Sequence, residues 1–222
     1  MRVNVRVAVV DDQILVRAGL AALLRAAPGI DVVGEAGSGE EAIRLATTQR
    51  PDVMPVDVRM PGMSGITATE RILTTCGEDA PKVIILTTFA LDEYVYNALR
   101  VGASGFLLKD TPPERLIAAV QTVASGDILL ASVAIRRLIE AYDSPAVQVP
   151  PPSLAGLTPR ETEVVRLVGR ALSNGQIAET LQVSEATVKT HLNRLMAKLG
   201  LCSRAQVVVL AYDCGLVRPG MR

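Results

Sequence analysis

The feature that most constrains this chain is a regular alternation of two kinds of segment between Arg6 and Ser125. Short runs rich in valine, isoleucine and leucine alternate with amphipathic stretches of helical length. Such alternation is typical of parallel strands joined by helices, because each connection has to return along one face of the sheet. It predicts an α/β fold with a doubly wound parallel sheet.

The pattern resolves into five strand–helix units. The predicted strands are 5–10, 31–35, 52–57, 82–87 and 105–108, and the predicted helices lie near 14–26, 39–49, 65–75, 91–101 and 113–125. Five units favour a five-stranded sheet of flavodoxin-like order 2-1-3-4-5. Ligands of such sheets bind at the carboxyl ends of the strands, so chemistry is expected in the loops after the first, third, fourth and fifth strands.

A connecting segment follows at residues 126–152. It has helical spacing over 131–142 and ends in three consecutive prolines, 150–152, which favour an extended connection. We therefore predict one domain at 1–125, a linker with a helical segment at 126–152, and a second domain at 153–222.

The second domain carries repeated helix-start signals and no strand pattern. Thr158 and Glu161 fit one capping box, Ser173 and Gln176 fit another, and Ser184 can cap a third helix that runs to residue 200. The last two helices are separated only by a short turn. The sequence therefore predicts a small all-α domain that contains a helix-turn-helix.

Charge and composition exclude several classes of protein. The net charge is zero, with 23 basic and 23 acidic side chains, but residues 1–125 hold 12 basic and 15 acidic ones, whereas 153–222 hold 9 and 5. A basic domain suits a polyanion, and a solvated surface explains the excess equally well.

No apolar run reaches ~18 residues and no signal-peptide pattern is present, so we expect a cytoplasmic protein without a membrane partner. Three scattered cysteines and a single histidine, His191, argue against a disulfide framework and a Ser-His-Asp triad.

Polar residues of particular types stand at the predicted strand ends. They are Asp11, Asp12, Asp57, Thr87 and Lys109. Because the carboxyl ends of central parallel strands meet, we expect three carboxylates and one ammonium in one pocket, where oxygen ligands suit Mg²⁺. One carboxylate could then act as a nucleophile toward a phosphoryl group. Each aspartate alone is also a common turn or cap residue, and only the joint pattern favours chemistry.

These residues and their neighbours resemble the receiver domain of two-component response regulators. The matching motifs are Val-Val-Asp11-Asp12, Val-Asp57-Val-Arg-Met-Pro-Gly, Ile-Leu-Thr87-Thr and Gly-Phe106-Leu-Leu-Lys109-Asp. The resemblance implies that Asp57 accepts the phosphoryl group. It also implies that Asp12 binds Mg²⁺ directly, that Asp11 binds it more indirectly, and that the backbone carbonyl of Arg59 is a further ligand.

The same resemblance implies a switch. Thr87 would hydrogen-bond the phosphoryl group, Lys109 would pair with it, and Phe106 would turn inward when Thr87 moves. Two residues depart from the family pattern. Pro55 removes an amide donor within a central strand and could displace the acceptor aspartate slightly, and Ser64 stands where an acidic residue often occurs.

In the last long helix of the second domain, four apolar residues form one stripe. They are Val188, Leu192, Leu195 and Leu199. The opposite face is left free, and its residues could reach base edges in a major groove. A solvated charged helix would have the same pattern.

The whole helical segment resembles the LuxR-type helix-turn-helix of NarL/FixJ-like regulators. Matching motifs include Leu-Thr158-Pro-Arg-Glu161, Leu-Ser173-Asn-Gly-Gln-Ile-Ala and Val-Ser184-Glu-Ala-Thr187-Val-Lys189-Thr190. The resemblance implies DNA binding, for which the candidate residues are Thr187, Lys189, Thr190, Asn193, Arg194 and Lys198. In this family the helix after Arg204 packs the domain and can pair with its copy in a dimer.

The two resemblances together predict a transcriptional regulator controlled by phosphorylation and not an enzyme. A sensor histidine kinase would phosphorylate Asp57, and the phosphorylated chain would bind promoter DNA as a homodimer; binding to RNA polymerase is left open. One rival is a Mg²⁺-dependent phosphohydrolase with an aspartate nucleophile, but Arg59 occupies the position of its second aspartate. Another rival is a regulator with a vestigial receiver, which Pro55 keeps open.

Overall fold

The computed structural model describes residues 4–88, 92–126, 129–130, 154 and 156–217. Strands and helices alternate through the first half as predicted, with bounds that agree to within one residue. The elements are β1 (Val5–Val10), α1 (Ile14–Ala26), β2 (Ile30–Ala36), α2 (Gly39–Gln49), β3 (Val53–Asp57), α3 (Gly65–Cys76), the 3₁₀ helix η1 (Gly77–Asp79), β4 (Lys82–Thr87), α4 (Asp92–Val101), β5 (Gly105–Leu108), α5 (Pro113–Ala124) and β6 (Leu129–Leu130).

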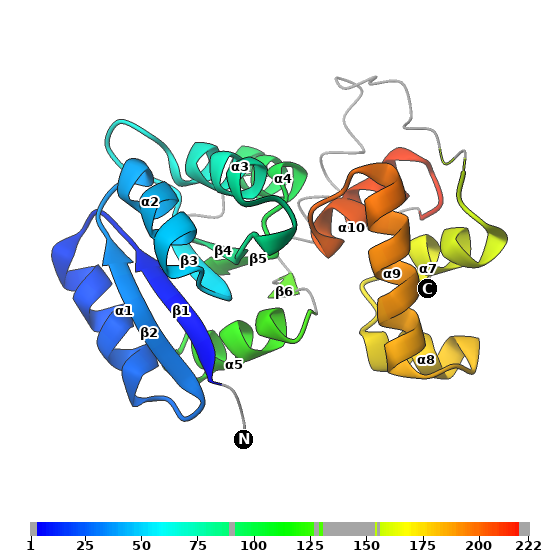
Figure 1. The fold of residues 1–222 in the computed structure, drawn as a ribbon, viewed down its shortest axis with the longest axis horizontal. Helices are drawn as coiled ribbons and strands as arrows, with labels where there is room; N and C mark the ends of the chain where they lie inside the picture. The colour runs from blue at the N-terminus through cyan, green and yellow to red at the C-terminus, as the bar shows by residue number, and fades with distance from the viewer. Residues whose placement is uncertain (1–3, 89–91, 127–128, 131–153, 155, 218–222) are drawn as a thin grey trace.

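The strands form one parallel sheet of order β2-β1-β3-β4-β5-β6 (Figure 1). The predicted order 2-1-3-4-5 is confirmed, and the short strand β6 extends it at the β5 edge. Leu129 and Leu130 pair with Gly105 and Phe106, so the start of the segment assigned to the linker belongs to the sheet. The helical segment predicted over 131–142 and the three prolines lie outside the described residues.

Alternate strand residues face two separate layers of helices. Val7 and Val9 of β1 pack with α1 and α5, whereas Ala8 and Val10 belong to the cluster that includes α2, α3 and α4. Successive side chains of a strand point to opposite faces of the sheet, and all four of these residues are fully buried. Covering of both faces is expected for a parallel sheet, and it directs the polar side chains to the strand ends.

Pro55 interrupts β3 on one side only. Amides of a strand point alternately to its two neighbours, and the N–H of Val58 donates to Leu86 O of β4 at 2.9 Å. Position 55, three residues earlier, therefore faces β1. All five residues of β3 pair with β4, whereas the described register to β1 consists of Val53 and Val56. The proline thus reduces the pairing of β3 with β1 and leaves its pairing with β4 intact.

The second half is all-helical, and the predicted helix starts are confirmed. Its elements are α7 (Pro159–Gly169), α8 (Asn174–Leu181), α9 (Glu185–Leu199) and α10 (Arg204–Asp213). Thr158 and Ser173 each form a capping box, Ser184 caps α9, and Gly200 ends it in the left-handed conformation. Between α8 and α9 the chain turns at Gln182, also left-handed, which makes the pair a helix-turn-helix.

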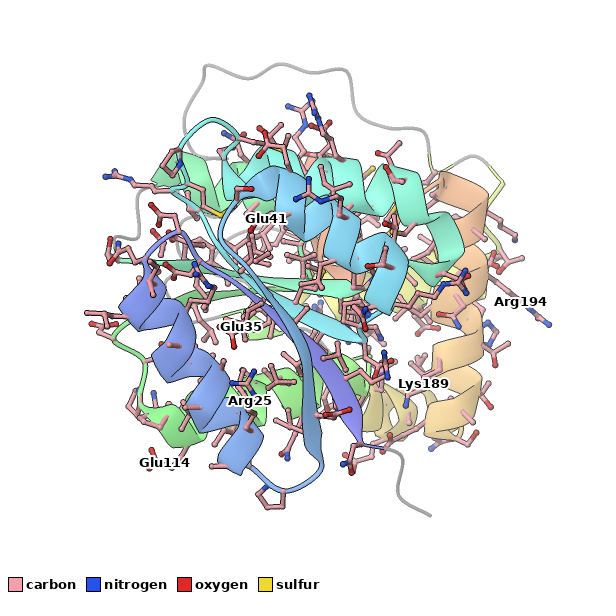
Figure 2. The ribbon with its side chains drawn as sticks, turned by 60° about the vertical axis from the view of Figure 1, so that its left-hand side comes forward. Arg25, Glu35, Glu41, Glu114, Lys189 and Arg194 are labelled. Carbon is pink, nitrogen blue, oxygen red and sulfur yellow. The ribbon has the colours of Figure 1, made fainter. Side chains whose placement is uncertain are left out.

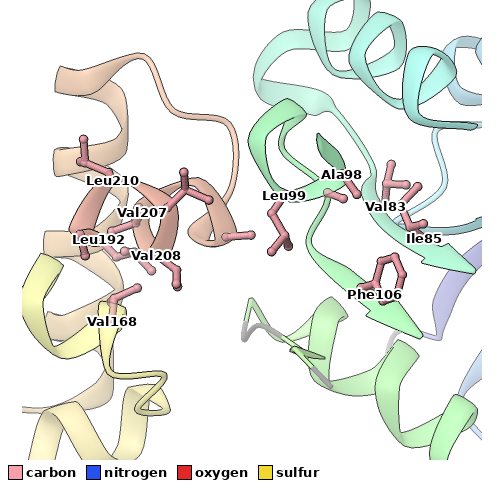
Figure 3. Packing of buried hydrophobic residues seen from close by; sticks show 14 of the residues in the cluster. Val83, Ile85, Ala98, Leu99, Phe106, Val168, Leu192, Val207, Val208 and Leu210 are labelled. Carbon is pink, nitrogen blue, oxygen red and sulfur yellow. The ribbon is translucent and has the colours of Figure 1, made fainter. Parts of the chain in front are cut away.

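The two halves touch where α10 meets α4. The Nε2 of Gln206 donates to the carbonyl oxygen of Arg100 at 2.9 Å. Leu99 of α4 and Val207 of α10 belong to one cluster of buried apolar residues (Figure 3). Within the described ranges, no single helix is long and apolar enough to cross a membrane; α9 and α10 satisfy that test only as a pair bent by 67°.

Candidate functional site

Three carboxylates and one ammonium meet at the carboxyl edge of the sheet, as the sequence predicts. Lys109 Nζ lies 2.7 Å from Asp11 Oδ2 and 3.1 Å from Asp57 Oδ2. Ligand oxygens of Asp11, Asp12 and Asp57 all lie within 4.8 Å of one another. Asp11 is fully buried and Asp57 is 4% exposed, so this is an interior cluster of charge and not a solvated acidic patch.

A tight turn after β3 holds Asp57 in place. The N–H of Gly65 donates to Val58 O at 2.9 Å, and a Cβ at Gly65 would lie 1.9 Å from the carbonyl oxygen of Asp57. Only glycine fits such an approach. Ser64, the second departure from the family pattern, caps α3 by accepting the N–H of Thr67 at 3.2 Å, and its role is therefore structural.

Asp11 and Asp12 differ in what satisfies their oxygens. Asp11 Oδ1 accepts the N–H of Gln13 at 3.0 Å, and its Oδ2 faces Lys109. Asp12 Oδ1 is buried and has no hydrogen-bond donor among the described residues. A buried carboxylate oxygen without a partner is costly. An oxygen-only donor set with one such orphaned atom fits a hard divalent cation such as Mg²⁺.

The pocket has an excess of negative charge. Burial raises the pKa of Asp57 above its ordinary value of 3.8, although the charge and hydrogen bond of Lys109 act in the opposite direction. Burial also disfavours the charged form of Lys109, but its hydrogen bond to Asp11 and the charge of Asp57 outweigh that effect and raise its pKa. The ammonium therefore stays charged at neutral pH and faces three carboxylates.

Thr87 is the last residue of β4, as predicted, and Phe106 lies within β5. Thr87 is buried, and its carbonyl accepts the N–H of Lys109 at 2.8 Å. The ring of Phe106 is 1% exposed and belongs to the cluster with Val83 and Ile85 (Figure 3). The ring is therefore already buried in this structure, which shows no outward position from which it would turn inward. The switch role of both residues stays a prediction.

A cavity of about 460 Å³ adjoins the acidic cluster. It is lined by Asp12, Arg59 and neighbouring residues between Val58 and Ile66. Its volume lies in the range of small-molecule pockets. Arg59 also donates its backbone N–H to the Asp57 carboxylate, and the predicted use of its carbonyl as a metal ligand stays a prediction.

In the second half, α9 turns its apolar stripe inward. Val188, Leu192 and Leu195 are buried. Of the candidate DNA contacts, Thr187 is half-buried, and the exposed ones are Lys189, Thr190, Asn193, Arg194 and Lys198. Figure 2 shows Arg194 extending outward from α9. The outer face of the second helix of the helix-turn-helix is thus polar, basic and accessible.

Lys198 differs from the other candidates because its ammonium has a partner. Its Nζ lies 2.7 Å from Glu161 Oε2 and donates to Gly156 O at 3.3 Å. Glu161 also accepts the N–H of Thr158 at 2.8 Å. The hydrogen bonds from Lys198 and Thr158 lower the pKa of Glu161 from 4.5 to about 2. This ion pair clamps α9 to the start of α7.

Comparison with known proteins identifies both halves. Residues 7–121 match the family model of the response regulator receiver domain, and residues 155–211 match that of bacterial regulatory proteins of the luxR family. The chain belongs to the two-component response regulators. Its N-terminal half is the receiver and its C-terminal half is the LuxR-type DNA-binding domain, so it is built for phosphorylation-dependent regulation of transcription.

Relatives match this response regulator over nearly its whole length. It is 42% identical to the uncharacterized transcriptional regulatory protein YxjL of Bacillus subtilis, over 97% of this chain and 98% of that protein. It is 39% identical to the DNA-binding transcriptional activator DevR/DosR of Mycobacterium tuberculosis, over 97% of each. The crystal structure of the response regulator ChrA of a heme-sensing two-component system aligns with 36% identity and a TM-score of 0.53, over 97% of this chain and 100% of that one. The two sequence relatives are named as regulators of transcription.

Sequence reasoning misses two residues beside these sites. Arg17 of α1 donates from Nη1 to the carbonyl oxygen of Asp11, but in sequence it is one more basic residue on a helix. Glu161 is recognised as part of a capping box, but its ion pair to Lys198 joins residues 37 positions apart. No local pattern predicts such a contact.

Proposed function

We propose that this response regulator accepts a phosphoryl group on Asp57 from a sensor histidine kinase and then binds promoter DNA through α9 as a homodimer in the cytoplasm. The observation that carries the proposal is the cluster of three carboxylates, of which Asp11 and Asp57 are buried and paired with Lys109, whereas Asp12 Oδ1 has no donor among the described residues. A pocket with surplus negative charge suits a cation, and the cation in turn can offset the charge of a phosphoryl group, whereas a structural ion pair would be balanced.

In the transfer step the Asp57 carboxylate attacks the phosphorus of a phosphohistidine. The new P–O bond replaces the P–N bond, and the imidazole leaves. Lys109 Nζ, 3.1 Å from Asp57, neutralises charge on the transferred group. Thr87 ends β4 and Phe106 lies within the neighbouring strand β5, so a contact of Thr87 made only after transfer would favour a second conformation.

Mg²⁺ is the cofactor that this donor set fits. Asp12 and Asp57 would hold it directly, Asp11 more indirectly, and the carbonyl of Arg59 would add a ligand. When bound, the ion offsets the negative charge of the carboxylates and of the incoming phosphoryl oxygens. Burial raises the pKa of Asp57, and a bound cation would act in the opposite direction by favouring the carboxylate.

The kinase has an apolar surface to dock on beside the pocket. The exposed large hydrophobic side chains of the described residues are Ile14, 71% exposed, and Leu15, 88% exposed. They follow Asp11 and Asp12 at the start of α1, so a helix of the kinase that covered them would bring its phosphohistidine to the carboxylates. Apolar side chains left in water beside a reactive site favour a partner of this kind.

The DNA contacts divide by their place on α9. We assign Lys189, Thr190 and Asn193 to base edges, and Thr187, Arg194 and Lys198 to the backbone phosphates. A two-fold dimer would present two such helices to half-sites about 10 bp apart. The boundaries 1–125, 126–152 and 153–222 are part of the proposal, and contact with RNA polymerase is left open.

The test compares the full chain before and after phosphorylation. Acetyl phosphate with Mg²⁺ should shift the parent protein on a Phos-tag gel, and the shifted form should sediment as a dimer and select a two-half-site motif from random DNA. A chain that binds the same DNA equally well without any shift would instead be a regulator with a vestigial receiver, the rival that Pro55 leaves open.

A further inference from the structure

The peptide of Asp11 lies where β1 leaves the sheet. The register of β1 with β2 ends at Val10 and Ala36, and the N–H of Asp11 still donates to Ala36 O at 3.1 Å. In a parallel strand the amide and carbonyl of one residue face the same neighbour, so the Asp11 carbonyl faces the β2 side beyond the last paired residue. Asp11 is fully buried, and its carbonyl therefore needs a donor from the protein.

Arg17 supplies this donor. Its Nη1 donates to the Asp11 carbonyl oxygen, and its Nε lies 3.8 Å from Glu35 Oε2. The other oxygen of Glu35 accepts from Arg25 at 2.9 Å, and Figure 2 labels Glu35 and Arg25 between β2 and α1. The Arg17 side chain is only 19% exposed. Its guanidinium is thus held between the end of β1 and the second strand.

We propose that Arg17 is a positioning residue for the metal site. By holding the Asp11 carbonyl it fixes the peptide that joins Asp11 to Asp12, and with it the direction in which Asp12 enters the pocket. The inference rests on the proposed function, in which the pocket takes Mg²⁺, and Asp12 carries the buried oxygen without a donor. Groups that orient ligands contribute to metal affinity without touching the metal.

Two effects of Arg17 have opposite signs, which makes the proposal testable. A guanidinium bound to the Asp11 carbonyl repels a cation in the neighbouring pocket, so its removal by charge alone would tighten metal binding. Loss of the hydrogen bond to the carbonyl would free the Asp11–Asp12 peptide and weaken metal binding. The proposal states that the second effect is the larger one.

Gly37 offers a milder way to disturb the same contact. A Cβ at Gly37 would lie 3.1 Å from Nη1 of Arg17, and Gly37 does not have a left-handed φ. Gly37→Ala therefore pushes the guanidinium by a few tenths of an ångström without removing its charge or straining the backbone.

The experiment measures Mn²⁺ binding, by the electron paramagnetic resonance signal of the free ion, for the full-length parent, Arg17→Met, Gly37→Ala and Arg25→Met. Arg25→Met is the matched control, because it removes a cation from the same Glu35 but touches no peptide of the pocket. Arg17→Met should bind Mn²⁺ about 10-fold more weakly, Gly37→Ala should shift in the same direction by less, and Arg25→Met should stay within about 2-fold of the parent.

A second readout separates positioning from general damage. With acetyl phosphate as donor, Arg17→Met should need more Mg²⁺ for half-maximal phosphorylation but should reach the parent's maximal extent. Equal or tighter Mn²⁺ binding by both Arg17→Met and Gly37→Ala would overturn the proposal, as would an equal loss in Arg25→Met. If Arg17→Met does not fold, Gly37→Ala decides. A parent protein that binds no Mn²⁺ would instead refute the proposed function itself.

Discussion

The receiver and the DNA-binding domain each place a lysine against a buried carboxylate, and the two clusters differ in charge balance. Lys109 faces Asp11 and Asp57, with Asp12 beside them, so that one ammonium meets three carboxylates. Lys198 faces Glu161 alone, and that carboxylate is further satisfied by Thr158. The first cluster retains surplus negative charge and the second does not.

Under the proposed function, this difference is one between a reactive site and a structural one. A buried carboxylate whose charge is matched by one lysine, and whose oxygens are hydrogen-bonded, holds two helices together and needs nothing more. A buried cluster with surplus charge is destabilising until something binds, and its persistence indicates a ligand. The contrast also appears in the two acids, because burial raises the pKa of Asp57, whereas hydrogen bonds from Lys198 and Thr158 lower that of Glu161.

The largest effect should come from the same carboxylate-to-amide change made in each cluster. Asp57→Asn should abolish phosphorylation by acetyl phosphate, because an amide does not attack phosphorus as a carboxylate does. Glu161→Gln should leave phosphorylation at the parent level. A Phos-tag gel of the three proteins measures both outcomes.

The assignment of Asp57 as the acceptor also requires that Asp57→Asn stays folded. Because burial disfavours the charge of Asp57, Asp57→Asn should not lower the thermal stability of the receiver, so loss of labelling could not be ascribed to unfolding. Equal labelling of Asp57→Asn and the parent would show that another residue accepts the phosphoryl group.

Most of the fold and the acidic pocket could be predicted from the sequence, since the signals are local. Alternating apolar runs predict the sheet, and Asp11, Asp57 and Lys109 are found at strand ends because strand order fixes which ends meet. Strand β6 could not be predicted, since two leucines are too short a pattern. Contacts such as Lys198 with Glu161 depend on how helices pack, which no local pattern encodes.

The next effect concerns DNA recognition by the two lysines of α9. Lys189 is exposed, so Lys189→Ala should cost about 1–3 kcal/mol of discrimination at one or two base pairs. Lys198 is tied to Glu161, so Lys198→Ala should weaken binding to all sequences alike by loosening α9 and removing a phosphate contact. Selection of binding sites from random DNA tests both variants. If Lys198→Ala changes the selected motif and Lys189→Ala does not, the recognition face lies on the other side of the helix.

An effect of similar size is expected on stability from breaking the balanced cluster. Glu161→Gln should destabilise the helical domain by about 1–3 kcal/mol at neutral pH, because Lys198 and Thr158 lose a charged acceptor. Glu161 has a pKa of about 2 in the folded chain against 4.5 ordinarily, so its contribution is present above pH 4.5 and is lost as the pH falls from 4.5 toward 2. Calorimetric unfolding of the full chain should show the parent and Glu161→Gln converging over that range, and a constant gap would contradict the assigned role.

The smallest effect should appear where the two regions touch. Gln206 serves two contacts at once, since its Oε1 accepts the N–H of Ser203 at 3.3 Å in the capping box that starts α10 and its Nε2 donates to Arg100 O of α4. Gln206→Glu keeps the acceptor for the cap but replaces the donor to α4 with a carboxylate oxygen. Gln176→Glu makes the same change in the α8 capping box, which has no hydrogen bond to α4 within the described residues, and is the matched control. Because the hydrogen bond is exposed, its loss should weaken the association of the two domains by only about 0.5–1.5 kcal/mol. Small-angle scattering should therefore show a larger radius of gyration for Gln206→Glu and an unchanged one for Gln176→Glu.

If both variants expand equally, capping and not the Gln206–Arg100 bond keeps the receiver and the DNA-binding domain together.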